Sequence, residues 1–178
     1  FFFAGLESPA LSLRFSFALP LAAFMTSGQR CTAISRVIVH KDIAKEAKDI
    51  LAAKASAMKM GSGLEAATDI GPLCNQPHWQ DVCDVTAKAI AEGARPLTGG
   101  SAPGAPEDGY FYSPTILDDV QHHSIAGQQE IFGPVLSVLE YESFDDAIEM
   151  LNGTEFWLTS ALFSNRNDLV QRFLAESQ

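Results

Sequence analysis

The sequence predicts an α/β protein with a mainly parallel sheet and helices on both faces of that sheet. Short apolar runs rich in β-branched residues alternate with longer segments of helical spacing, and this rhythm continues from Val37 to the end of the chain. The chain has 178 residues, 47% of them hydrophobic, which is enough for one domain with a substantial core but not for two large ones.

The first predicted strand is the apolar run at residues 36–40. A helix should follow it, with Asp42 in the N-cap position, apolar residues at helical spacing and an end at the Gly-Ser-Gly sequence of residues 61–63. A second helix is predicted to begin at Pro77, a residue suited to the first helical turn. Cys83 lies on the inner face of this helix, so we expect it to be a buried structural thiol.

The second half of the chain continues the alternation of strands and helices. The predicted elements, in order, are a strand at 94–98, an extended segment at 110–117, a strand at 135–139, a helix capped by Ser143, a strand at 158–163 and a last helix from Asn165. Pro114 places the extended segment at a sheet edge or a kink, because proline cannot donate to a β-ladder.

Residues 1–23 form a strongly apolar segment that we treat separately from residues 24–178. Arg14 lies inside the apolar region rather than before it, unlike the charge of a signal peptide, and the run from Phe15 to Met25 is too short to span a bilayer. We therefore interpret this segment as part of a core that ends in a helix leading to Cys31. The chain starts with Phe1 and stops inside a helical pattern, so we expect both ends to be cut from a longer protein.

The charge and the cysteine count exclude several classes of partner and site. A formal net charge of −10 argues against a nucleic-acid partner, because no basic stripe is available to neutralise phosphates. Three cysteines are an odd number, which fits a reducing compartment better than a disulfide framework, and we predict a cytoplasmic protein. The adjacent histidines 122 and 123 lack cysteine or carboxylate company, so we expect no metal site.

Residues 26–33, Thr-Ser-Gly-Gln-Arg-Cys-Thr-Ala, form a polar turn that presents Cys31. A cysteine attacks as its thiolate, which a nearby cation or the N–H groups at a helix start can stabilise. Arg30 could supply the cation and a short helix at 32–36 the N–H groups. Local chemistry alone leaves open that Cys31 is a small buried apolar residue.

The second informative stretch is Gln-Glu-Ile-Phe-Gly-Pro-Val at residues 129–135. It places a carboxylate, Glu130, two residues before an aromatic ring, Phe132, just ahead of a Gly-Pro break and an apolar strand. Considered alone, this stretch leaves open that Glu130 is an ordinary surface glutamate and Phe132 an ordinary core phenylalanine, without a role in a site.

Together, Gly-Gln-Arg-Cys at 28–31 and Glu-Ile-Phe-Gly-Pro-Val at 130–135 resemble the aldehyde dehydrogenase superfamily. Further segments agree with the pattern of that family: Asp-Ile-Gly-Pro-Leu at 69–73, Leu-Thr-Gly-Gly at 97–100 and Gly-Tyr-Phe-Tyr-Ser-Pro-Thr at 109–115. The resemblance covers residues 24–178. It implies a partial catalytic domain from which the dinucleotide-binding domain is absent.

The resemblance also implies a mechanism and a set of site residues. Cys31 would attack a small aldehyde to give a thiohemiacetal, with its own backbone N–H near the oxyanion, and hydride transfer to NAD or NADP would leave a thioester. Glu130 would hold the nicotinamide ribose and Phe132 would pack beside the nicotinamide. The sequence Gln-Arg-Cys-Thr-Ala at 29–33 is most similar to members that act on semialdehydes, and we expect a homo-oligomer in the full-length form.

The chain departs from the family pattern in ways that limit this expectation. Phe3 stands where the family has the glutamate that activates water, Glu7 is off that motif, and Trp157 stands where a glycine is usual. We therefore expect the isolated chain to be inactive. Two alternatives remain open: a non-catalytic binding or assembly module derived from the same fold, and a thiol esterase that depends on Cys31.

Overall fold

The computed structural model describes residues 19–104, 108–156 and 158–178. Phe3, Glu7 and Trp157, together with most of the apolar segment, lie outside the described residues, and the proposed division at residues 23 and 24 stays a prediction. Residues 19–24 are helical and lead into the short helix η1 (Met25–Gly28), so a helix does precede the cysteine turn.

The elements that follow alternate as the sequence predicts. They are β1 (Arg36–His40), α2 (Lys41–Ala57), α3 (Gln76–Ala91), β2 (Arg95–Thr98), β3 (Thr115–Asp118), α4 (Ile125–Gln128), β4 (Val135–Tyr141), α5 (Phe144–Asn152) and α6 (Asn167–Glu176). The strands form a four-stranded sheet in the order β1-β4-β3-β2. β4 runs parallel to β1 and β3, and β2 is antiparallel to β3, which confirms a mainly parallel sheet.

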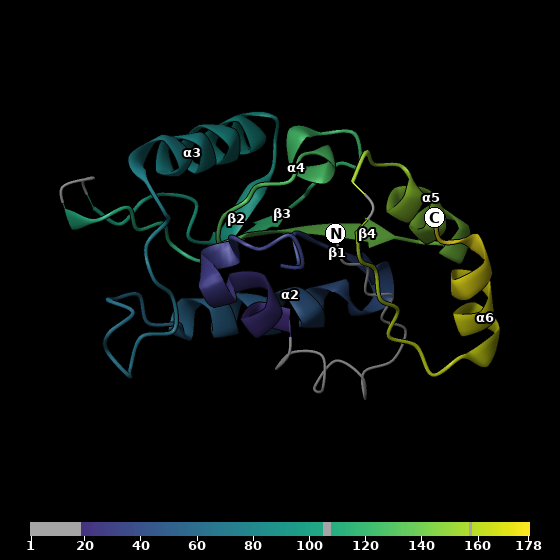
Figure 1. Ribbon diagram of the computed structural model, residues 1–178. Helices are drawn as coiled ribbons and strands as arrows, with labels where there is room; N and C mark the ends of the chain where they lie inside the picture. Colours follow the sequence, from purple (N-terminus) through teal and green to yellow (C-terminus); the bar gives the residue numbers. More distant parts are fainter. Residues whose placement is uncertain (1–18, 105–107, 157) are drawn as a thin grey trace.

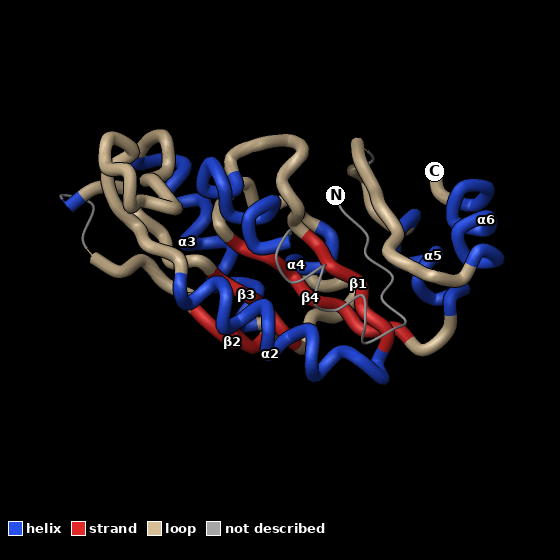
Figure 2. Tube along the Cα trace, turned by 90° about the horizontal axis from the view of Figure 1, so that it is seen from below, coloured by secondary structure: helices blue, strands red, loops and turns tan. Residues whose placement is uncertain are grey.

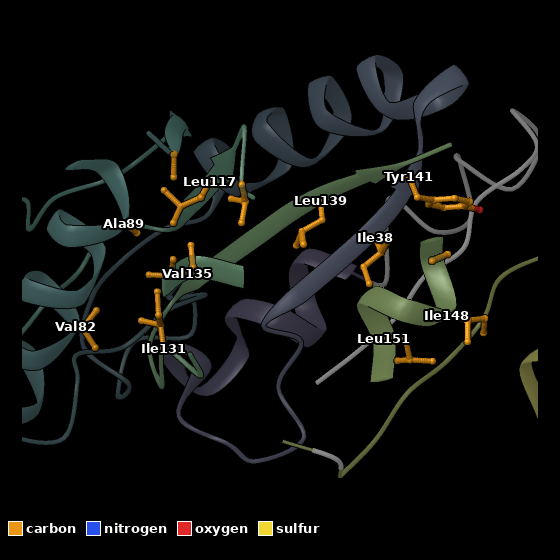
Figure 3. Packing of buried hydrophobic residues seen from close by; sticks show 14 of the residues in the cluster. Ile38, Val82, Ala89, Leu117, Ile131, Val135, Leu139, Tyr141, Ile148 and Leu151 are labelled. Carbon is orange, nitrogen blue, oxygen red and sulfur yellow. The ribbon is translucent and has the colours of Figure 1, made fainter. Parts of the chain in front are cut away.

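Helices cover both faces of this sheet, as expected (Figure 1). On one face α2 and the helical residues 19–24 pack against Val37, Val39 and Val138, and Figure 2 shows α2 in front of the strands. On the other face Ile38, Leu117 and Leu139 pack against residues of α3, α5 and α6 (Figure 3). The alternation of side chains along each strand divides these two cores.

Side chains at the helix starts explain most of the boundaries. His40, rather than Asp42, is the N-cap of α2, because its Nδ1 accepts from the Asp42 backbone N–H at 3.3 Å. Asn75 caps α3, so Pro77 occupies the first turn as predicted. Ser143 forms a capping box with Asp146 at the start of α5. α2 ends at Ala57, before the predicted glycine stop.

One prediction about an extended segment is wrong, and the structure adds detail to a second. The strand expected at 158–163 is wrong, since these residues have no strand assignment. Leu162 packs against one core and Phe163 against the other, so the alternating apolar pattern reports burial on both sides without a paired backbone. In the segment 110–117 only the part after Pro114 joins the sheet, starting at Thr115.

Within the described ranges, no helix is long and apolar enough to span a membrane. Among the same residues, no group of three or more His, Cys, Asp or Glu side chains is arranged to hold a metal ion.

Candidate functional site

The two predicted site segments lie at the same edge of the sheet. The turn at 26–33 precedes β1 and the segment at 130–134 precedes β4. β1 and β4 are parallel neighbours, with Arg36 opposite Ser137, so their amino ends meet. Cys31 and the pair Glu130 and Phe132 are therefore brought to one end of the sheet although they are far apart in the sequence.

The cysteine turn has an unusual backbone. Thr26, Ser27 and Gly28 all have left-handed φ angles, of 59°, 57° and 68°. This region is unfavourable for a β-branched residue such as Thr26, so the backbone is strained at the start of the turn that carries the cysteine. Cys31 then lies exposed in a single turn that is closed by the Ala33 N–H donating to the Arg30 carbonyl at 2.9 Å.

The helix expected after Cys31 is wrong. A bend leads from the turn directly into β1, which begins at Arg36, so no run of helix N–H groups flanks the thiol. Arg30 is exposed beside Cys31 and remains the only adjacent cation of the turn. The residues after the turn run into extended backbone instead, because the apolar strand β1 begins at Arg36.

A glycine contact joins the cysteine turn to the Glu130 segment. A Cβ atom added to Gly28 would lie only 2.0 Å from the Gly133 carbonyl oxygen and 3.1 Å from the Pro134 nitrogen. Only a residue without a side chain permits this approach. The motif glycine at 28 and the motif glycine at 133 are therefore the point where the two segments touch.

A third segment, the loop at 71–75, holds the cysteine turn from another side. The buried Ser27 hydroxyl donates to the Gly71 carbonyl at 2.7 Å. The Gln29 side-chain oxygen accepts from the Cys74 backbone N–H at 2.8 Å. These bonds fix the residues on the amino side of Cys31, while the cysteine itself remains exposed. Gln29 lies inside the cysteine motif, but its contact with the loop is tertiary and has no signal in the sequence.

The Glu130 segment is held by its own tight turn, by burial of Ile131 and by a hydrogen bond from β1 to the preceding helix α4. The Gly133 N–H donates to the Ile131 carbonyl at 2.7 Å, and Ile131 is buried in the core. The buried Arg36 donates from Nη1 to the Gly127 carbonyl at 2.9 Å, which fixes the end of α4 just before the segment. Burial lowers the pKa of Arg36 to about 10, so this guanidinium remains charged at neutral pH.

His78 is the site residue that sequence reasoning missed. Its Nε2 lies 2.6 Å from the Phe132 carbonyl oxygen, and the two rings meet edge to face at 6.2 Å between centroids. No motif pointed to it, because the contact joins residues 54 positions apart. Its only signal was its position at the start of a helix directly after the loop at 71–75.

Two hollows flank Phe132. The first has a volume of about 440 Å³ and is lined by Thr26, Gln29, Cys74, His78 and Phe132. The second has a volume of about 320 Å³; it is lined by Glu130, by His78 and Phe132, which it shares with the first, and by further residues of α3. A half-buried carboxylate and an aromatic ring thus border one concave surface, next to the turn that carries Cys31.

Among the described residues, the Glu130 carboxylate makes no hydrogen bond or ion pair, so both of its oxygens can accept from a ligand.

Cys83 differs from the exposed Cys31: it is half-buried against the core, and burial, assisted by the charge of Asp84, raises the pKa of its thiol. Cys83 was expected to be buried and is only half-buried, and its structural role stays a prediction.

Comparison with known proteins identifies the family of this arrangement. The family model described as "Aldehyde dehydrogenase family" matches residues 18–178. A probable betaine aldehyde dehydrogenase of Schizosaccharomyces pombe is 35% identical over 161 residues, which are 89% of this chain and 32% of that protein. A peroxisomal aminoaldehyde dehydrogenase of Pisum sativum is 38% identical over 149 residues, 84% of this chain and 30% of the relative.

Solved structures resemble the whole described fold. A 3,6-anhydro-L-galactose dehydrogenase in complex with NAP superposes with a TM-score of 0.92 at 30% identity, over 99% of this chain and 38% of that one. Betaine aldehyde dehydrogenase from Staphylococcus aureus, in complex with NAD⁺, gives a TM-score of 0.88 at 28% identity, over 98% of this chain and 35% of that one. The chain thus spans about a third of the length of these proteins.

Proposed function

Because this chain belongs to the aldehyde dehydrogenase family, we propose that it carries the nucleophile and the nicotinamide end of the cofactor site for NAD(P)-dependent oxidation of an aldehyde. The observation that carries the proposal is the contact between Gly28 and Gly133. It brings the turn that contains Cys31 against the segment that contains Glu130 and Phe132. This contact supports treating the cysteine, the carboxylate and the aromatic ring as parts of one site rather than of two unrelated motifs.

Cys31 is the proposed nucleophile. Its thiolate adds to the aldehyde carbon, so an S–C bond forms, the carbonyl π bond breaks and the oxygen becomes an oxyanion. The Cys31 backbone N–H donates to no other described residue, so it is free to donate to that oxygen. The exposed position of Cys31 in its turn leaves the sulfur accessible to a small substrate.

Glu130 and Phe132 fit the nicotinamide end of a dinucleotide. A carboxylate with two unoccupied oxygens matches the paired hydroxyl groups of a ribose, and an aromatic ring on the wall of the same hollow offers a flat apolar contact for the nicotinamide. When bound, NAD or NADP supplies the acceptor for the hydride of the aldehyde carbon. The chain's own contribution is to hold this end of the cofactor in place.

The substrate proposal is a small aldehyde, with semialdehydes as the first class to test. The named relatives include betaine aldehyde and aminoaldehyde dehydrogenases, and one structural neighbour is a succinate-semialdehyde dehydrogenase from Burkholderia pseudomallei. The homo-oligomer and the cytoplasmic location stay predictions. Some relatives are named as peroxisomal or chloroplastic, so the family does not decide the location.

Acylation by a nitrophenyl ester, followed by peptide mass spectrometry, tests the nucleophile. We expect Cys31 to be acylated first, and the burst of nitrophenol to disappear in Cys31→Ala but persist in Cys74→Ala. Cys74 is a matched control because it is also an exposed, unpaired cysteine. Faster acylation of Cys74 or Cys83 would remove Cys31 from its proposed role. Continued ester turnover by Cys31 would favour the thiol esterase instead.

A coupled pair of measurements separates the enzyme from the assembly module. NAD(P)H absorbance with short aldehydes and semialdehydes should show little or no steady turnover by these 178 residues alone, because Glu130 and Phe132 contact only one end of a dinucleotide. Steady turnover would overturn that expectation. A monodisperse oligomer that binds no nucleotide would favour the non-catalytic module.

A further inference from the structure

We propose that His78 is a positioning residue that fixes the main chain of the Glu130–Phe132 segment relative to the cysteine turn. This inference rests on the proposed function, since it assigns the purpose of that geometry to cofactor binding. The carrying observation is the contact of 2.6 Å between His78 Nε2 and the Phe132 carbonyl oxygen. A carbonyl only accepts hydrogen bonds, so Nε2 must carry the proton and donate.

The backbone of His78 is itself held firmly. Its N–H donates to the Asn75 side-chain oxygen at 2.9 Å, and Pro77 restricts the preceding turn of α3. α3 is anchored in turn by Val82 and Ala89, which are buried in the core. The imidazole therefore projects from a rigid element.

Ile131 is buried in the core and Gly133 contacts Gly28, but the Phe132 carbonyl between them is not held by the turns of the segment itself. Gly133 and Val135 donate within the segment itself, to the carbonyls of Ile131 and Gly133, each at 2.7 Å. Among the described residues, His78 is the donor to the Phe132 carbonyl. Loss of this bond would release the main chain between Glu130 and Gly133, the part that carries both proposed cofactor contacts.

The location of His78 links this support to the site. The imidazole lines the hollow that contains Gln29 and also the hollow that contains Glu130. Gln29 is bonded to the loop that leads into α3, so α3 is tied to both the cysteine turn and the Glu130 segment. His78 is thus placed to keep these two parts in register without reacting itself.

Hydrogen exchange and NADH fluorescence titration on the 178-residue chain test the proposal. His78→Phe keeps a ring but removes the donor, and His78→Gln retains a donor on its side-chain amide. We expect exchange of the Gly133 and Val135 amides to accelerate about tenfold and NADH affinity to fall about fivefold in His78→Phe, with both restored to within about twofold in His78→Gln. The matched substitutions at the exposed His123, His123→Phe and His123→Gln, should change neither the amide exchange rates nor the NADH affinity.

Each outcome separates positioning from the other possibilities. Unchanged exchange rates in His78→Phe would overturn the proposal, and so would a loss of NADH affinity without faster exchange, because His78 would then act by direct contact. A lower urea midpoint together with faster exchange throughout α3 would overturn it as well, because His78 would then stabilise the whole of α3 rather than position the Glu130–Phe132 segment. If the unmodified chain binds no NADH, the cofactor part of the proposed function fails, while the exchange rates still decide whether His78 holds the segment.

Discussion

The acidic side chains at the carboxyl ends of β3 and β4 are both ion-paired with Lys48 of α2, whereas Glu130, which precedes β4, has no ion-pair partner among the described residues. The buried Asp118 accepts from Lys48 at 2.8 Å and from Arg95 at 2.6 Å, and Lys48 also contacts Glu140 at 2.6 Å. At the opposite end Glu130 has no polar partner among the described residues, and Cys31 is exposed.

This difference distinguishes a structural cluster from a candidate site. Burial alone would lower the pKa of Lys48, but its hydrogen bonds to Asp118 and Glu140 outweigh that effect and raise it, so the network favours its own charged state. Ligand sites of open parallel sheets usually lie at the carboxyl ends of the strands. Here the candidate site residues precede β1 and β4, and the close contact of Gly28 with Gly133 holds their segments together at the amino ends.

Gly28→Ala should give the largest effect, because the new Cβ would meet the Gly133 carbonyl at 2.0 Å in a left-handed backbone. We expect the free energy of unfolding to fall by about 4 kcal/mol, the sum of overpacking and backbone strain. Urea unfolding measures it. Gly63→Ala is the matched control, since nothing lies within 4 Å of its added Cβ, and it should change stability by less than about 0.5 kcal/mol. Equal effects at both glycines would contradict the contact between turn and segment.

Asp118→Asn should disrupt the opposite end of the sheet. Asp118 is 2% exposed and pairs with two cations, so removing its charge leaves Lys48, itself only 15% exposed, without one partner. We expect a loss of about 3 kcal/mol, as for other broken buried pairs. Asp119→Asn, at a side chain 58% exposed, should cost less than about 1 kcal/mol.

The same Asp118→Asn chain should still show preferential acylation of Cys31 under conditions where it is folded. This outcome is expected because the two ends of the sheet share no polar contact through Asp118. Loss of Cys31 reactivity in the folded variant would show that the paired cluster and the candidate site are coupled.

Sequence reasoning identified the linear parts of the site but not the contacts between them. Cys31, Glu130 and Phe132 lie within short motifs. The strands β1 and β4 coincide with apolar runs that can be recognised in the sequence. The contact of Gly28 with Gly133 and that of His78 with Phe132 depend on tertiary packing, which local patterns do not contain. The failed strand at 158–163 has the same cause, since apolar alternation reports burial rather than pairing.

Thr26→Asn should stabilise the candidate site end by about 1 kcal/mol, because asparagine tolerates the left-handed φ of 59° better than a β-branched residue. The urea midpoint should rise without a change in slope. Thr32→Asn, at another exposed threonine of the same turn, is the control and should have no measurable effect. A lower midpoint for Thr26→Asn would mean that the bond from the Thr26 hydroxyl to the Met25 carbonyl outweighs the strain.

The smallest effect should be a pH dependence centred on His122, beside the paired end of the sheet. Burial, followed by the charges of His123 and Arg36, lowers the pKa of His122, and Glu149 opposes this only in part. The unfolded chain, with an ordinary histidine pKa of about 6.5, then binds more protons than the folded chain as the pH falls below that value. Stability is therefore complete above about pH 6.5 and declines as the pH falls towards the lowered folded pKa.

Urea unfolding at about pH 7.5 and about pH 5.5 tests this dependence above the range where carboxylates titrate. His122→Gln should reduce the loss of stability between the two values, because it removes the group whose protonation is disfavoured in the folded state. His123→Gln should retain most of the loss, since burial of His122 is the larger cause of its shift. If His122→Gln loses as much stability as the unmodified chain, the acid sensitivity belongs to the ion pairs around Asp118 rather than to this imidazole.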